Sequence, residues 1–141
     1  MTTHYAPQAK GWSPARESDA GNLQGVIGYF PDTVSVLADD TIQMVKIPLG
    51  AIVMDCILET GPLGTSVTAA VGDEDDPDRY ISATDHSAAA LTRRKQTNKN
   101  GVPYRYTAED TIDVTVAAAN VDDNQALRLD VFYICGVDET P

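Results

Sequence analysis

Apolar and polar side chains alternate with a period of two in several short segments, and this alternation restricts the possible folds of the chain more than any other feature. In residues 126–134, ALRLDVFYI, the positions on one face are Leu127, Leu129, Val131 and Tyr133. The positions between them are Arg128, Asp130 and Phe132. Successive side chains of a β-strand point to opposite faces, so the pattern predicts a strand with one buried face. The same period places Ile112, Val114 and Val116 on one face of residues 111–117, and Val67, Ala69 and Val71 on one face of residues 65–71, opposite Ser66, Thr68 and Ala70.

Further strand candidates lie between turn signals. They are residues 23–30, 33–38, 41–47 and 50–59, separated by Pro31-Asp32, Asp39-Asp40 and Pro48 and followed by TGPLG. Many short alternating strands divided by Gly, Pro, Asn and Asp are typical of an antiparallel β-sandwich or barrel. The single helix candidate is DHSAAALTRR, residues 85–94, with Asp85 as its cap. Asn100-Gly101 predicts a tight turn.

The first 21 residues differ from the rest of the chain because they have little apolar periodicity. Pro7 and Pro14 make this segment a poor helix or central strand, so we expect an extended N-terminal arm. Tyr5 and the chain's single tryptophan, Trp12, lie in it, and large aromatic side chains are expected to pack either on the domain or on a neighbouring subunit. The prediction is an arm over residues 1–21 and one β-sandwich domain over residues 22–141.

The charge of the chain limits its partners. The 141 residues include 21 acids and 10 bases, a formal net charge of −11, which repels phosphate backbones and anionic membrane surfaces. We therefore expect neither a nucleic-acid nor a membrane partner. No apolar run approaches a membrane span of about 20 residues, and the N-terminus lacks a signal-peptide pattern, so we expect the chain to begin in a cytoplasm. Cys56 and Cys135 are expected to be buried thiols, with a disulfide closing a long loop as the alternative.

The segment VGDEDDPDRYISA, residues 71–83, has five acids in the six positions 73–78. Clustered carboxylates suit calcium, but Pro77 interrupts the run and the acid–glycine spacing of a calcium-binding EF-hand is absent. The segment predicts a solvated hairpin loop in which Arg79 returns to pair with one of the acids, with an ion site as the alternative. No metal site is expected.

Catalytic patterns are weak. Adjacent acids that hydrate freely do not acquire the separated pKa values that acid–base catalysis needs. The two histidines, His4 and His86, are too few for a multi-histidine metal site, and neither a nucleophile elbow nor a glycine-rich phosphate loop is present. We expect no enzyme activity, no catalytic residue and no cofactor.

Half of the positive charge lies within 13 positions, at Arg93, Arg94, Lys95, Lys99 and Arg105. This concentration fits a loop that docks on an acidic partner. It also fits an exposed loop whose charges keep it soluble, and both interpretations stay open.

The order of motifs resembles a known protein class. TIQMVKIPLGAIVMDCILET is followed by TSVTAAVGDEDDPDRYISAT, then by YRYTAEDTIDVTV and LRLDVFYI. Over residues 23–134 this series resembles the decoration or cement proteins on the heads of tailed bacteriophages, most specifically in VGDEDDPDRYI and YTAEDTIDVTV.

The resemblance implies a β-sandwich of jelly-roll type that forms a homotrimer on the outside of a capsid. Such a protein bridges subunits of the major capsid protein, belongs to the virion and is assembled in the cytoplasm of the bacterial host. Under this interpretation Asp78 and Arg79 pair at a corner of the sandwich, and Tyr80 and Ile81 begin the next strand. The residues expected to contact other subunits or the capsid are Tyr5, Pro7, Trp12, Pro14, Arg93, Arg94 and Lys95.

Two alternative functions remain open. One is a different virion component, in the tail or the head–tail connector. The other is a carbohydrate-binding sandwich module, for which Tyr104 and Tyr106 would be the candidate aromatic platform.

Overall fold

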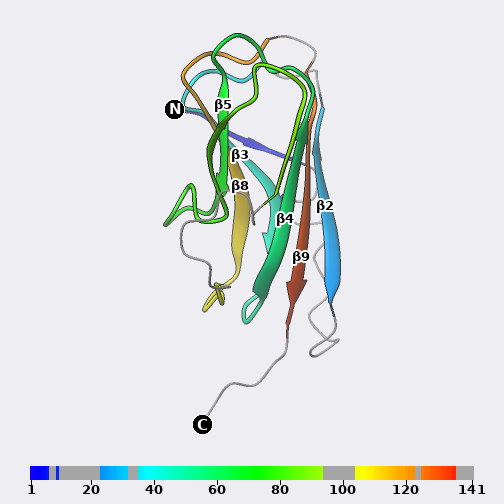
Figure 1. The fold of residues 1–141 in the computed structure, drawn as a ribbon. Helices are drawn as coiled ribbons and strands as arrows, with labels where there is room; N and C mark the ends of the chain where they lie inside the picture. The colour runs from blue at the N-terminus through cyan, green and yellow to red at the C-terminus, as the bar shows by residue number, and fades with distance from the viewer. Residues whose placement is uncertain (7–8, 10–22, 32–34, 94–103, 123–124, 136–141) are drawn as a thin grey trace.

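The computed structural model describes residues 1–6, 9, 23–31, 35–93, 104–122 and 125–135, and it is an all-β sandwich of two sheets over these ranges (Figure 1). The strands are β1 (Thr3–Tyr5), β2 (Gln24–Phe30), β3 (Thr41–Ile47), β4 (Ile52–Thr60), β5 (Thr68–Gly72), β6 (Ile81–Asp85), β7 (Ala90–Arg93), β8 (Asp110–Ala117) and β9 (Leu127–Ile134). Within the described ranges, no helix is of the length and apolarity that crossing a membrane requires.

One sheet has the strand order β1-β3-β8-β5-β6 and the other has the order β2-β9-β4-β7. The pairing is nested, because β5 pairs with β6, β4 with β7, β3 with β8 and β2 with β9, always antiparallel. The chain from β2 to β9 therefore follows the course of one long hairpin folded over onto itself. The tip of that hairpin is the β5–β6 connection, residues 73–80, which contains the acidic run.

The core lies between the sheets, and the alternating residues supply it as expected. Ile112, Val114 and Val116 of β8 are 0% exposed, and in β9 the side chains of Leu129 and Val131 are 0% exposed as well. Burying one such side chain contributes about 1.5–3 kcal/mol, so the alternation of these two central strands is a major source of stability. Cys56 and Cys135 are both buried and are not joined by a disulfide, which confirms the prediction of two buried thiols.

The helix predicted over residues 85–94 is wrong. Asp85 ends β6, and its carboxylate accepts a hydrogen bond of 2.8 Å from the backbone N–H of Ser87, so the expected cap stabilises a turn. Residues 90–93 then form β7, whose backbone pairs with Ile57–Thr60 of β4. Pairing at a sheet edge overrides the helix propensity of the alanines, which is a weak preference of under about 1 kcal/mol per residue.

The strand predicted over residues 33–38 is also absent where the structure describes it, from Ser35 to Ala38. Val36 is nevertheless buried, and the turn at Asp39-Asp40 is present, with Asp39 at a φ of 70°. The turn predicted at Asn100-Gly101 lies outside the described residues.

The described start of the predicted arm is part of the sandwich. Strand β1 pairs in parallel with β3, which makes it the one parallel strand among those described. Asp40 fixes this segment, since its carboxylate accepts hydrogen bonds from Thr2 N (2.7 Å) and Leu37 N (3.0 Å) and lies 2.9 Å from His4 Nε2. Residues 10–21 lie outside the described part of the chain, so the boundary between arm and domain stays a prediction.

Candidate functional site

The acidic tip of the hairpin is built around one buried carboxylate, Asp73, which is 1% exposed. It accepts hydrogen bonds from Arg79 Nε at 2.6 Å, from Tyr106 Oη at 2.8 Å and from the backbone N–H of Asp76 at 2.9 Å. The prediction that Arg79 returns to pair with an acid of the run is confirmed. The acid is not solvated, however, because the loop folds inward around it.

Tyrosines extend this network into the core. Tyr80 Oη donates to Tyr106 Oη at 2.9 Å, and the guanidinium carbon of Arg79 lies 3.7 Å from the centre of the Tyr104 ring. Burial raises the pKa of Tyr80 and Tyr106. Burial opposes the charge of Arg79, but its bond to Asp73 outweighs that effect and raises the pKa of the guanidinium. The tip thus contains the ion pair of Asp73 and Arg79, with tyrosine side chains packed around it.

The turn into this tip requires glycine at position 72. A Cβ atom there would collide with the backbone of Asp76 and Pro77, because the loop folds back over Gly72. The result is a tight clamp that joins residues 73–80 to residues 104–106. Tyr106 is 3% exposed, which argues against an exposed glycan platform formed with Tyr104.

Among the described residues, the structure shows no cluster of possible ion ligands around the acids of the tip. Across the described ranges, no three His, Cys, Asp or Glu side chains are grouped so that they could hold a metal ion. Both carboxylate oxygens of Asp73 are occupied by protein donors.

Beside the tip, the outer face of the five-stranded sheet contains a second buried carboxylate. Asp113 of β8 lies between Gln43 of β3 and Gly72 of β5 in the sheet register, and it is 4% exposed. Its Oδ1 atom is buried and has no hydrogen-bond partner. Burial is the main cause that raises the pKa of Asp113 to about 7, and the negative charges of Asp110, Asp73 and Glu74 raise it further. The hydrogen bond from Thr111 acts in the opposite direction and lowers the pKa.

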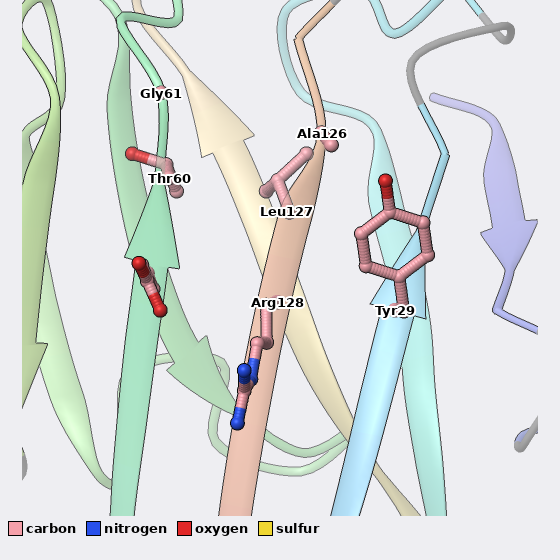
Figure 2. Close-up of a pocket in the computed structure, with 7 residues that line it drawn as sticks. Tyr29, Thr60, Gly61, Ala126, Leu127 and Arg128 are labelled. Atoms are coloured by element: carbon pink, nitrogen blue, oxygen red, sulfur yellow. The ribbon is translucent and has the colours of Figure 1, made fainter.

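The outer face of the four-stranded sheet has a different character. Figure 2 shows Tyr29 of β2 and Arg128 of β9 on neighbouring strands. They line a hollow of about 370 Å³ together with Glu59, Thr60, Gly61, Ala126 and Leu127. Tyr29 is 49% exposed and Ile27, on the same face of β2, is 48% exposed. This face therefore offers exposed apolar surface next to charged groups.

The predicted contact residues are only partly described. Tyr5 is 47% exposed on the edge strand β1, and the backbone of Arg93 pairs with Ile57 at the end of edge strand β7. Strand β1 lies next to β3, and β3 contacts β2 at one end of the four-stranded sheet. Strand β7 is at the opposite end of that sheet, so the structure does not bring Tyr5 and Arg93 together. The other five predicted contact residues lie outside the described residues: Pro7, Trp12, Pro14, Arg94 and Lys95.

Sequence reasoning missed Asp113 and the role of Tyr106. Asp113 is at an outward position of an alternating strand, a pattern that predicts exposure. Tyr106 is 33 positions from Asp73, and no local signal joins the two.

Comparison with known proteins gives matches of structure only. No protein-family model matches the chain, and no curated protein matches it by sequence. A chain in the capsid of Ralstonia phage GP4 is similar with a TM-score of 0.77 and 19% identity, over 96% of this chain and 99% of that one. A chain in the capsid asymmetric unit of cyanophage Pam1 gives 0.69 and 22% identity, over 86% of this chain and 90% of that one. A chain in the acidic stable capsid of Helicobacter pylori bacteriophage KHP30 gives 0.57 and 18% identity, over 84% and 93%. At these identities the likeness is one of fold.

Proposed function

We propose that this chain is a structural virion protein, a capsid decoration or cement protein that binds the outside of a phage head and stabilises it by bridging subunits of the major capsid protein. The observation that carries the proposal is the fold that it shares with chains of three phage capsids. The matched regions cover 99%, 90% and 93% of those chains, so the likeness is to small separate chains and not to one domain of a larger subunit.

The strand order supports the jelly-roll type of sandwich. Strands β2–β9 divide into 2-9-4-7 and 3-8-5-6, the arrangement that a long antiparallel hairpin gives when it is wrapped into two sheets. Such a fold leaves two outer faces and the edge strands available for other chains. The half-exposed Ile27 and Tyr29 on one outer face provide apolar contact area of the kind that interfaces use.

The proposal includes a homotrimer that is assembled in the host cytoplasm and has no nucleic-acid or membrane partner. Its contacts with neighbouring subunits would be made by the seven residues identified from the sequence: Tyr5, Pro7, Trp12, Pro14, Arg93, Arg94 and Lys95. The edge position and exposure of Tyr5 support its inclusion.

Particles lacking the protein provide the direct test. Adding the purified chain should give co-sedimentation at a copy number close to the number of capsid sites, together with release of DNA at a higher temperature than in bare particles. Binding at only a few copies per particle would indicate a tail or connector component instead. No binding, or no gain in particle stability, would contradict the cement function.

A matched pair of variants tests the contact residues in the same assay. Tyr5→Ala removes an exposed edge-strand aromatic and should weaken binding, whereas Thr107→Ala changes an exposed residue outside the predicted contacts and should not. Light scattering behind a sizing column, with calcium and then with a chelator, tests the trimer. A trimer in both supports a metal-independent assembly, and a trimer that dissociates in chelator would revive an ion site at the acidic loop.

A further inference from the structure

A polar cavity opens on the outer face of the five-stranded sheet, between the hairpin tip and the N-terminus. Its volume is about 240 Å³, below the roughly 300–1,000 Å³ of typical small-molecule sites. It therefore has room for the end of a side chain together with water. The lining residues include Met1, Thr41, Gln43, Glu74, Asp113 and Thr115.

Asp113 is the group in this cavity that lacks a full set of partners. The side chain is 4% exposed and a hydroxyl of Thr111 bonds the carboxyl group, yet Oδ1 has neither water access nor a donor. A buried polar atom in this state destabilises the fold, and more so when it is charged. Asp113 lines the cavity, so its incompletely satisfied carboxyl group is a position for a donor from outside the chain.

The negative charge around the cavity favours a cationic group as the hydrogen-bond donor to Asp113. Asp73 is neutralised by Arg79, but Glu74 and Asp113 have no such partner among the described ion pairs. The described lining residues include no Lys, Arg or His side chain, and their one positive group is the α-amino group of Met1, a residue that is 94% exposed. Asp110 of β8 adds a further negative charge from the same strand.

We propose that this cavity receives the ammonium group of a lysine presented by a neighbouring protein chain of the capsid. The proposal names the partner chemistry of the capsid contact and so rests on the proposed function. An ammonium is a compact charge with three donors, which fits one free carboxylate oxygen among the oxygens of Thr41, Gln43 and Thr115. A guanidinium pairs best with both oxygens of one carboxylate, and only one oxygen of Asp113 is free. A metal ion is disfavoured because the described residues provide no group of three ligands.

The first test measures binding to particles that lack the protein. Asp113→Asn keeps the size of the side chain and removes its charge, and we expect at least about a tenfold loss of affinity, as for buried charge pairs that lose one partner. Glu74→Gln changes an exposed residue at the mouth of the cavity and should weaken binding by a smaller factor. Asp75→Asn is the matched control, because this exposed acid belongs to the same loop but does not line the cavity, and its affinity should equal that of the wild type.

Zero-length carbodiimide coupling on the assembled particle gives a second measurement. An amide between Asp113 and a lysine of the neighbouring chain should be found by mass spectrometry, and it should vanish in Asp113→Asn. Equal affinities of the wild type and Asp113→Asn, with both proteins folded, would overturn the lysine site while leaving the cement function intact.

A probe in solution separates the two proposals if the wild type does not bind particles at all. The carboxyl carbon signal of Asp113 should shift saturably when N-acetyl-lysine amide is added, and it should not respond to N-acetyl-norleucine amide, which has the same chain length without the charge. The lysine-specific shift would support the site even where the cement function has failed. Identical responses to the two compounds would overturn the site.

Discussion

Asp73 and Asp113 both line the polar cavity beside the hairpin tip, and both are buried, but their surroundings differ. Asp73 is 1% exposed and its oxygens accept bonds from a guanidinium, a phenol and a backbone amide. Asp113 is 4% exposed and one of its oxygens has no donor. The comparison shows that burial of a carboxylate stabilises a fold only when donors are buried with it. The first acid therefore holds the hairpin tip closed, and the second is available for a partner.

The largest change in the free energy of unfolding is expected when Asp73, whose oxygens all have donors, is replaced. Asp73→Asn removes the charge that pairs with Arg79 and disturbs the bond to Tyr106, and losing one member of a buried pair costs about 3–5 kcal/mol. Urea unfolding at pH 7 should show this loss in the free energy of unfolding. Asp75→Asn, with the same change of charge at an exposed position, should stay within about 0.5 kcal/mol of the wild type. Similar values for the two variants would show that the network contributes no stability.

The unsatisfied acid should behave in the opposite way. The pKa of Asp113 is about 7 in the folded chain and 3.8 in the unfolded chain. The contribution of protonated Asp113 to the free energy of unfolding is therefore greatest below pH 3.8 and is lost as the pH rises through 7. At 1.36 kcal/mol for each unit, the loss amounts to at most about 4 kcal/mol. Asp113→Asn should accordingly be about 1–4 kcal/mol more stable than the wild type at pH 8, and this advantage should shrink toward pH 4.

Urea unfolding at pH 4, 6 and 8 checks this prediction. The charged groups that influence the result are Asp73 and Glu74 of the tip, Asp110 of the same strand and the α-amino group of Met1. Parallel pH profiles for Asp113→Asn and the wild type would mean that Asp113 is not held protonated.

A smaller effect is expected from the phenols that complete the network of Asp73. Tyr106→Phe removes the bond to Asp73 and leaves the Tyr80 hydroxyl without its acceptor, at a cost of about 1–3 kcal/mol. Tyr80→Phe removes only the outer bond and should cost about 0.5–1.5 kcal/mol. The double variant should cost less than the sum, since the two hydroxyls share one bond. Additive values in unfolding experiments would indicate that the phenols act independently of each other.

Local patterns in the sequence determined most of the framework. The alternation in β8 and β9 predicted which side chains are buried, and the proline and acidic pairs marked the turns at Asp39-Asp40 and after β3. The acidic loop predicts a partner for Arg79 within the same loop, and the structure provides it in Asp73, six positions away. These features depend on near neighbours in the chain, and the sequence displays such neighbours directly.

Only the tertiary structure decided which residues are covered by segments that are distant in the sequence. Residues 90–93 became a strand because β4 offered an edge, and Asp113 became buried because the tip folds back over Gly72 beside it. The alternating pattern of β8 predicts exposure for Asp113, and nothing within that strand reveals the covering loop. Burial on an outer face depends on contacts made across the fold, so the unsatisfied carboxylate appears only once the two segments lie together.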